Sequence, residues 1–166
     1  LAHHRDDLVV TLLKDYFIAL YARHVGRYDP ITFRKFIRGN PINFPLMKNL
    51  ISDGIVSTMA IKVPISPSCI LIRPLAYISE QETTQYVSFL GLKAHGSGCS
   101  HEAFTSQEPT ASSKREIVHS EFRYRLEQDP TLGSELFDCA LLSLTSAGRP
   151  RANPRGRRQL LHPTFD

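Results

Sequence analysis

Apolar side chains recur every three or four residues along the first part of the chain. The stripe runs from Leu8 to Leu20, and this spacing predicts an amphipathic helix. Asp6 and Asp7 precede it, and their carboxylates suit the positive end of a helix. Gly26 follows the last periodic turn, which is a common way for a helix to stop. The first predicted element is therefore a helix that begins near Leu8 and ends before Gly26.

A second helix is predicted after Asn43. Asn43 is a good capping residue, Pro45 suits a first helical turn, and the pair Asp53-Gly54 marks the end. An apolar stripe at helical spacing fills the interval between these signals. Its members are Leu46, Met47, Leu50 and Ile51.

Other apolar runs favour strands, because they are short, rich in β-branched or aromatic residues and bounded by turn residues. The predicted strands cover residues 31–33, 55–63, 69–73, 117–126 and 138–144. The last of them runs out into a loop with two hydroxyl residues and a glycine, and a short helix over 132–137 precedes it. Residues 79–92 are compatible with two structures: a helix started by a Ser79–Glu82 capping box, or a strand over 86–90.

This order of elements predicts an α+β fold in which helices cover one face of a short sheet. We expect two small α/β layers. Residues 1–78 form an N-terminal α-β-α-β-β layer, and residues 115–166 form a mainly β C-terminal part with a short helix and a basic tail. Residues 79–114 form a connector with a polar inserted loop at 93–114, which is rich in Gly, Ser, Thr and His and could face a partner.

Charge is unevenly distributed. The chain of 166 residues carries a formal net charge of +4. Residues 1–148 hold fifteen Lys and Arg against fifteen Asp and Glu, so the excess lies in the tail. The tail arginines are Arg149, Arg151, Arg155, Arg157 and Arg158. A neutral body with a basic arm is typical of proteins that bind nucleic acid, and a solubilising tail is the alternative.

The three cysteines are odd in number and far apart, which indicates reduced thiols in an intracellular or organellar protein. Cys69 and Cys139 lie in apolar runs and are predicted to be buried. His95, Cys99 and His101 lack a fourth ligand at convincing spacing, so the sequence predicts no metal and no cofactor. Charged residues interrupt the most apolar region, so no membrane span is predicted.

Four local patterns, taken with their spacing, resemble the small-subunit ribosomal protein S-eight family. The first helix carries the run 11–15 (Thr-Leu-Leu-Lys-Asp), and the second ends in 50–56, with a Gly between aliphatic residues. An Arg-Tyr pair at 123–124 is followed, after an interval similar to the family's, by an aliphatic run that closes in Thr-Ser-Ala-Gly at 145–148. Divergence of this size, with an insertion at 93–114, suggests a mitochondrial member of the family, with a cytoplasmic one as the alternative.

The resemblance implies a non-catalytic constituent of the small ribosomal subunit. Such a protein stabilises a helical junction in the central domain of the small-subunit rRNA through minor-groove and phosphate contacts, beside neighbouring ribosomal proteins. Carried over to this chain, Thr145, Ser146 and Gly148 form the RNA-contacting loop, Lys14 contacts the backbone, and Ser143 serves if the register shifts. The tail arginines would neutralise phosphates, which agrees with the general chemistry of RNA recognition.

Two other classes of function stay open. The chain could be a protein-docking or assembly subunit without direct RNA contact, with 93–114 as its docking loop. A hydrolase could be built from Ser143 or Ser146 with His119 or His162. No nucleophile elbow, phosphate loop or paired metal-ligand motif accompanies these residues, so the sequence favours a protein that is not an enzyme and takes no small-molecule substrate.

Overall fold

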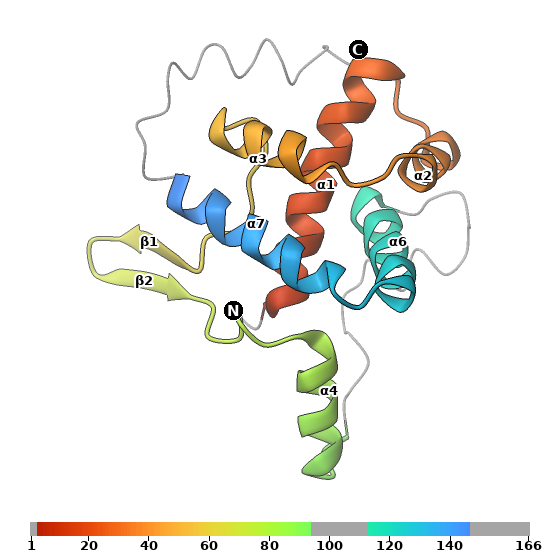
Figure 1. Cartoon of the computed structure of the whole chain (residues 1–166). Helices are drawn as coiled ribbons and strands as arrows, with labels where there is room; N and C mark the ends of the chain where they lie inside the picture. Colours follow the sequence, from red (N-terminus) through yellow and green to blue (C-terminus); the bar gives the residue numbers. More distant parts are fainter. Residues whose placement is uncertain (1–2, 94–112, 147–166) are drawn as a thin grey trace.

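The computed structural model describes residues 3–93 and 113–146 of the chain. Within these ranges it contains six helices and one two-stranded antiparallel sheet (Figure 1). The elements in chain order are α1 (Arg5–His24), α2 (Pro30–Gly39), α3 (Phe44–Ser52), β1 (Lys62–Ser66), β2 (Cys69–Ile72), α4 (Glu80–Phe89), α6 (Lys114–Gln128) and α7 (Leu132–Ser146).

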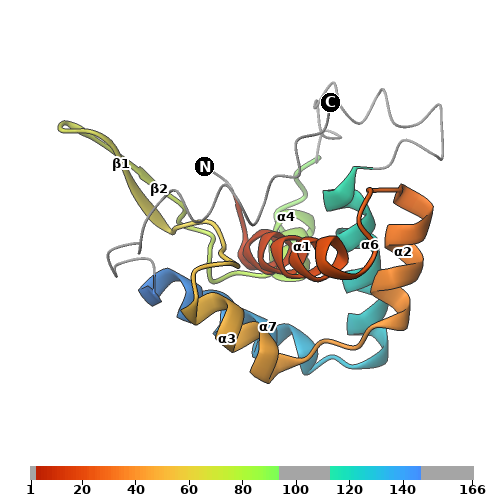
Figure 2. The same cartoon turned by 90° about the horizontal axis from the view of Figure 1, so that it is seen from above.

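Helix α1 is the centre of the structure. Ten of its twenty residues are buried, and they lie around most of its circumference instead of along one stripe. A helix that is apolar on nearly every side must be enclosed by other elements. The enclosing elements are α2, α6 and α7, which all pack against α1 and surround it in Figures 1 and 2. The predicted first helix is therefore confirmed, but it begins at Arg5 with His4 as its N-cap, so Asp6 and Asp7 lie in its first turn instead of capping it.

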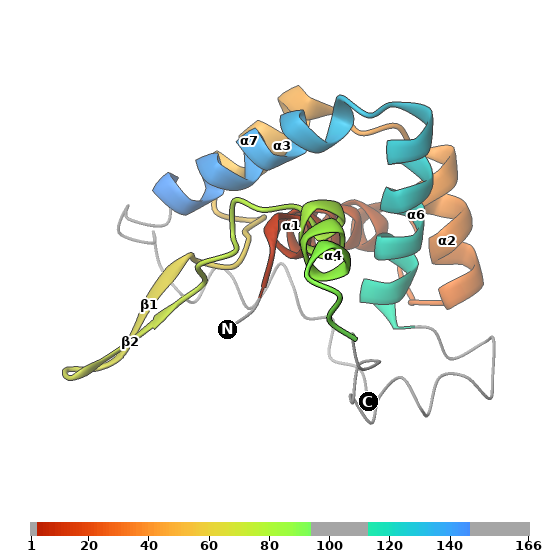
Figure 3. The same cartoon turned by 90° about the horizontal axis from the view of Figure 1, so that it is seen from below.

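The two short helices after α1 begin at clear capping signals. The Asp29 carboxylate accepts a hydrogen bond from the Thr32 backbone N–H at 2.7 Å, and Pro30 opens α2. The Asn43 side chain accepts from the Leu46 N–H at 2.9 Å and starts α3, as predicted. Helix α2 packs against α6, and α3 lies beside α7 (Figures 2 and 3). The predicted strand at 31–33 is wrong, because these residues form the first turns of α2.

The predicted strand at 117–126 is also wrong. Ser113 and Glu116 form a capping box, with the Ser113 N–H donating to Glu116 Oε2 at 2.7 Å, and α6 continues from there. The buried residues of α6 fall at i, i+1, i+4 and i+5, which is a helical period. They are Ile117, Val118, Glu121 and Phe122. The β-branched and aromatic content of this segment suggested a strand, but packing against α1 and α2 decides for a helix.

The predicted strand at 138–144 is helical as well, and it belongs to α7 together with the predicted short helix at 132–137. The buried positions Leu136, Cys139, Ala140 and Ser143 are spaced at i, i+3, i+4 and i+7. This spacing is one face of a helix, and that face packs on α1 and α3. The C-terminal part within the described range is therefore helical, not β-rich.

The remaining strands form a single hairpin. Lys62 pairs with Ile72, Val63 with Leu71 and Pro64 with Ile70. The predicted strand at 69–73 is confirmed within a residue, whereas the strand predicted at 55–63 begins only at Lys62. Figures 2 and 3 show the hairpin projecting away from the helices. The predicted α+β fold of two layers is therefore contradicted, since the described chain is a helical body with one hairpin.

One half-buried arginine, Arg125, joins α2, α6 and α1. The Arg125 Nη2 donates to the carbonyl oxygens of Ile37 at 2.6 Å and Asn40 at 2.9 Å, which are at the C-terminal end of α2. The central carbon of its guanidinium also lies 5.9 Å from the centroid of the Phe17 ring. Burial lowers the pKa of Arg125 from its usual value. The side chain therefore supplies donors to two carbonyls at the end of α2, where few backbone N–H groups are available; the Ile37 carbonyl also accepts from the Asn40 backbone N–H at 3.3 Å.

We predict that Arg125→Leu lowers the free energy of unfolding by about 1–3 kcal/mol, because the carbonyls of Ile37 and Asn40 both lose the guanidinium donor. Arg125→Lys should lose less, since it keeps one charged donor but not the fork of two. Urea denaturation followed by circular dichroism measures both. Gln128→Leu, at an exposed position in the same helix, is the control and should change stability by no more than about 0.5 kcal/mol. A loss for Arg125→Leu no larger than that of the control would contradict the assigned role.

Candidate functional site

The described residues of the predicted RNA site do not form one surface loop. Lys14 lies in the middle of α1, with its Nζ 3.6 Å from a carboxylate oxygen of Asp15. Ser143 is buried in α7, where its Oγ accepts a hydrogen bond from the Thr58 backbone N–H at 3.2 Å. Ser143 therefore holds the segment after α3 against α7.

Thr145 and Ser146 are the last two residues of α7. The tight loop predicted there after a strand is wrong, because the backbone is helical up to Ser146. Gly148 and the five tail arginines lie outside the described residues, as do 94–112 of the polar insertion and the candidate ligands His95, Cys99 and His101. The RNA contacts assigned to these residues stay predictions.

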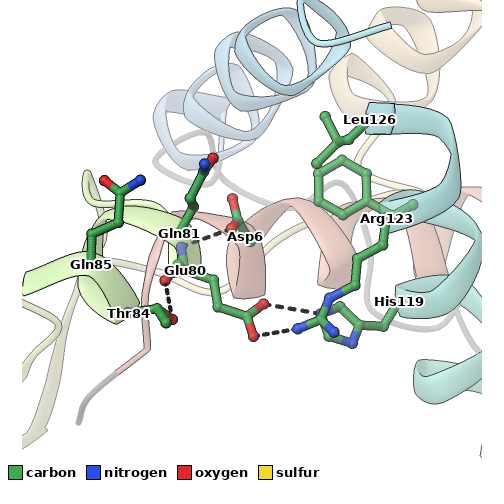
Figure 4. Close-up of a pocket in the computed structure, with 9 residues that line it drawn as sticks. Asp6, Glu80, Gln81, Thr84, Gln85, His119, Arg123 and Leu126 are labelled. Atoms are coloured by element: carbon green, nitrogen blue, oxygen red, sulfur yellow. Dashed lines mark hydrogen bonds and ion pairs between the residues drawn. The ribbon is translucent and has the colours of Figure 1, made fainter. Parts of the chain in front are cut away.

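A pocket lies where the root of α4 meets α1 and α6 (Figure 4). The Ser79 side chain and the Glu82 carboxylate form a capping box that starts α4, so the helical interpretation of 79–92 is confirmed. The Glu80 backbone N–H donates to Asp6 Oδ2 at 2.8 Å. The Glu80 carboxylate pairs with Arg123 and lies 3.4 Å from His119 Nε2. These contacts fix the first turn of α4 to the body.

The pocket has a volume of about 330 Å³ and combines an apolar floor with polar walls. The floor is Phe122 and Leu126, and the walls are Asp6, Glu80, Gln81, Thr84, Gln85, His119 and Arg123. Its polar groups are largely engaged with one another: Thr84, the one hydroxyl among the lining residues, donates to the Glu80 carbonyl at 2.9 Å. This arrangement offers no activated nucleophile, and its evident role is to anchor α4.

The charge on Glu80 is favoured by its neighbours. Partial burial raises the pKa of this carboxyl, but the hydrogen bond from Arg123 and the positive charges of Arg123 and the histidines outweigh it. The net result is a pKa below the usual value of 4.5. Glu80 is therefore ionised at neutral pH and binds Arg123 as a charge-assisted pair.

Beyond its root, α4 buries nothing. None of its ten residues is buried. Tyr86 is 63% exposed, Phe89 is 85% exposed and Leu90, the C-cap residue, is 47% exposed. These three occupy i, i+3 and i+4, so they form one apolar stripe. Figure 1 shows α4 extending away from the other helices.

The hairpin also presents apolar side chains to solvent. Ile65, Ile70 and Ile72 are all exposed. Cys69 is exposed too, so its predicted burial is wrong, whereas Cys139 is buried as predicted. The sequence does not predict the exposure of either projecting element, because the apolar run at 69–73 predicts a strand of a sheet covered by helices. The Ser79–Glu82 capping box was the one signal that pointed to α4.

The described ranges offer little for other classes of site. No three His, Cys, Asp or Glu residues in 3–93 and 113–146 come together in a way that could hold a metal ion. No helix within these ranges has the length and apolarity that a membrane span needs. No family model, no curated protein and no solved structure matches the chain.

We predict that Glu80→Gln destabilises the protein at neutral pH and that this difference disappears in acid. Because the folded pKa of Glu80 is depressed, its contribution is present above 4.5 and is lost as the pH falls below 4.5 through the folded pKa. Thermal unfolding of both proteins across this pH range measures the difference. The other carboxyls are the same in both proteins, so their effects on stability cancel in the difference between wild type and Glu80→Gln at each pH. A difference that stays constant with pH, or grows in acid, would contradict the ion pair.

Proposed function

We propose that this protein is an assembly subunit that binds another protein through α4, with the stripe of Tyr86, Phe89 and Leu90 inserted into an apolar groove of the partner. The observation that supports this most directly is that α4 buries none of its residues against the described body. The proposal assigns no reaction to the chain.

Helix energetics support the proposal. Isolated helices shorter than about 12–15 residues are marginal in water, and most helical stability in proteins comes from packing an apolar face. Helix α4 has ten residues and has only its capping box and its root contacts within the described ranges. Burial of its stripe in a groove would supply the missing packing.

The chemistry of the stripe specifies the kind of partner surface that it binds. Anchors at i, i+3 and i+4 are typical of a helix that binds in a hydrophobic groove. Aromatic residues are also the side chains that most often dominate binding energy at protein interfaces. No charged residue lies within the stripe itself, and Glu80 is committed to Arg123 at the opposite end of the helix. The partner surface should therefore be apolar, with shape complementarity and not charge as the main source of affinity.

The hairpin provides a second contact. Within the described residues the sheet has only two strands, so the outer edge of β1 pairs with no further strand there. Exposed edges of this kind accept an additional strand from another chain. The exposed side chains of Ile65, Ile70 and Ile72 would gain burial in the same contact. We therefore assign the hairpin to the same assembly role as α4.

Binding of small-subunit rRNA is the second candidate. Its support is the arginine-rich tail, which carries the whole net charge of the chain, together with the spacing resemblance to the S-eight family. A ribosomal location, mitochondrial or cytoplasmic, is part of this candidate. The helical body removes one argument for it, since the family resemblance implies an α+β fold. The two candidates are compatible, because a ribosomal subunit also contacts neighbouring proteins.

We predict that replacing the stripe by serine (Tyr86→Ser, Phe89→Ser and Leu90→Ser) abolishes partner binding without loss of stability. The three side chains are exposed, so the change in the free energy of unfolding should stay within about 1 kcal/mol. Tagged wild-type and variant proteins are expressed in cells of the organism that makes the protein. The native complexes are then separated by size, and the proteins in each are identified. The wild-type chain should migrate with a defined protein, and the stripe variant should migrate as the free chain.

Ser88→Ala is the control, since it changes an exposed polar position of the same helix outside the root pocket and should keep the complex. The proposal is wrong if the wild-type chain migrates alone, if the stripe variant keeps the same protein partner, or if the control loses it. Sedimentation of the purified wild-type chain shows whether it forms a dimer with a second copy of itself. A dimer held together by the α4 stripe would contradict the proposal, because the partner would then not be a different protein. Nuclease treatment that dissolves the complex would favour the rRNA candidate instead.

A further inference from the structure

We infer that the corner between α1 and α2 binds the phosphate backbone of a nucleic acid. The corner consists of Arg23, Arg27, Arg34, Lys35 and Lys114, and we call it the basic corner. This inference goes beyond protein docking by α4, and it extends the rRNA candidate by placing a phosphate-binding surface on the folded body instead of the tail alone.

The neutral balance of residues 1–148 conceals a strong separation of charge. Residues 16–52 contain six Lys and Arg but only one acidic residue, Asp29. That one carboxylate is engaged as the cap of α2. The other residues up to 148 carry nine Lys and Arg against fourteen Asp and Glu. The body is therefore positive around the end of α1 and along α2 and α3, and negative elsewhere.

Arginine pairing distinguishes the corner from the rest of the described chain. Outside the corner, each arginine of the described ranges has a polar side-chain contact with an acid, a histidine or a backbone carbonyl. These are Arg5, Arg38, Arg73, Arg115, Arg123 and Arg125. Arg23, Arg27 and Arg34 have no ion pair and no side-chain hydrogen bond among residues 3–93 and 113–146. Within the part of the chain that the structure describes, the guanidiniums without partners are thus confined to residues 23–34.

Packing brings these cations together. Arg23 lies in the last turn of α1, and Arg27 is in the short connection to α2. Arg34 is one helical turn before Arg38, whose Nε donates to both carboxylate oxygens of Glu121 on α6 at 2.9 Å. Arg34 is therefore on the side of α2 that faces α6.

Lys114 adds a cation from the start of α6. Its Nζ lies 4.3 Å from the centroid of the Tyr28 ring, and Tyr28 is in the connection between α1 and α2. The Tyr28 ring in turn packs edge-on against Tyr21 and tilted against Phe33. An aromatic cluster thus packs the connection against α1 and α2, and the cations lie around it.

The chemistry of the corner favours a nucleic acid over an acidic protein. Protein interfaces depend on apolar or aromatic anchors in their centre, and here the exposed large apolar residues are only Val25 and Ile31. Phosphate backbones need clustered cations without an apolar centre, and arginine matches phosphate with its fork of donors. We therefore assign the basic corner to backbone contact, which positions a nucleic acid without reading its sequence.

The test is a salt titration of binding to a fluorescent single-stranded RNA by the full chain. The corner variant is Arg23→Gln, Arg27→Gln and Arg34→Gln. Loss of three phosphate contacts should flatten the slope of log affinity against log salt by about 2 units, since each contact on a single strand contributes about 0.7. The matched control is Lys48→Gln, Lys62→Gln and Lys93→Gln, which removes the same charge from exposed positions elsewhere and should keep the wild-type slope.

The inference is overturned if the corner variant keeps the wild-type slope, or if the matched control flattens it equally, which would show general charge only. Tighter binding of an acidic peptide than of RNA would overturn it in favour of a protein partner. If the triple variant does not fold, Arg23→Gln with Arg27→Gln, both at exposed positions, should still flatten the slope by about 1.4 units. A variant with the five tail arginines replaced by alanine separates the contribution of the tail from that of the corner. If only this tail variant flattens the slope, the tail binds the phosphates and the corner does not. The serine stripe variant of α4 should bind RNA normally.

Discussion

The structure depends on the enclosure of α1. Leu8, Leu12, Leu13, Tyr16 and Phe17 are almost completely buried and face different directions around one helix. Each such side chain contributes roughly 1.5–3 kcal/mol when it is removed from water. Several helices must therefore pack around α1 at once, and this requirement brings α6 and α7 from the far end of the chain into contact with the first helix.

Polar contacts then fix how the surrounding helices are oriented. Arg125 joins α6 to the end of α2, Glu121 accepts from Arg38, and Arg115 pairs with Asp7 on α1. Helix α6 thus makes directed contacts with both α1 and α2. The same helix supplies Arg123 to the root of α4. The result is a rigid body from which α4 and the hairpin project, with the basic corner on the α1–α2 side. Apolar binding and charge-based binding are therefore assigned to different surfaces of one body.

The sequence predicts the elements that have local signals. Helix α1, the cap of α3 at Asn43 and the capping box of α4 at Ser79 were all predictable from a few neighbouring residues. Ile117-Val118 and Leu141-Leu142 suggested strands, because β-branched or continuous apolar runs fit a strand and a buried helix equally well. Only the distant α1 surface decides between them. In the candidate site, the tail charge is visible in the sequence. The exposure of Phe89, and the lack of a partner for Arg27 among the described residues, depend on tertiary packing that composition does not specify.

The central claim is that α1 is held by the whole fold whereas α4 beyond its root is held by very little until a partner binds. Native-state hydrogen exchange of the free chain tests this most directly. Amides in the middle of α1 should exchange only through global unfolding, and amides near Tyr86 and Phe89 should exchange through local opening at a much lower free energy. Equal protection of α4 and α1 in the free chain would contradict the account, because it would show that the described body already stabilises α4 fully.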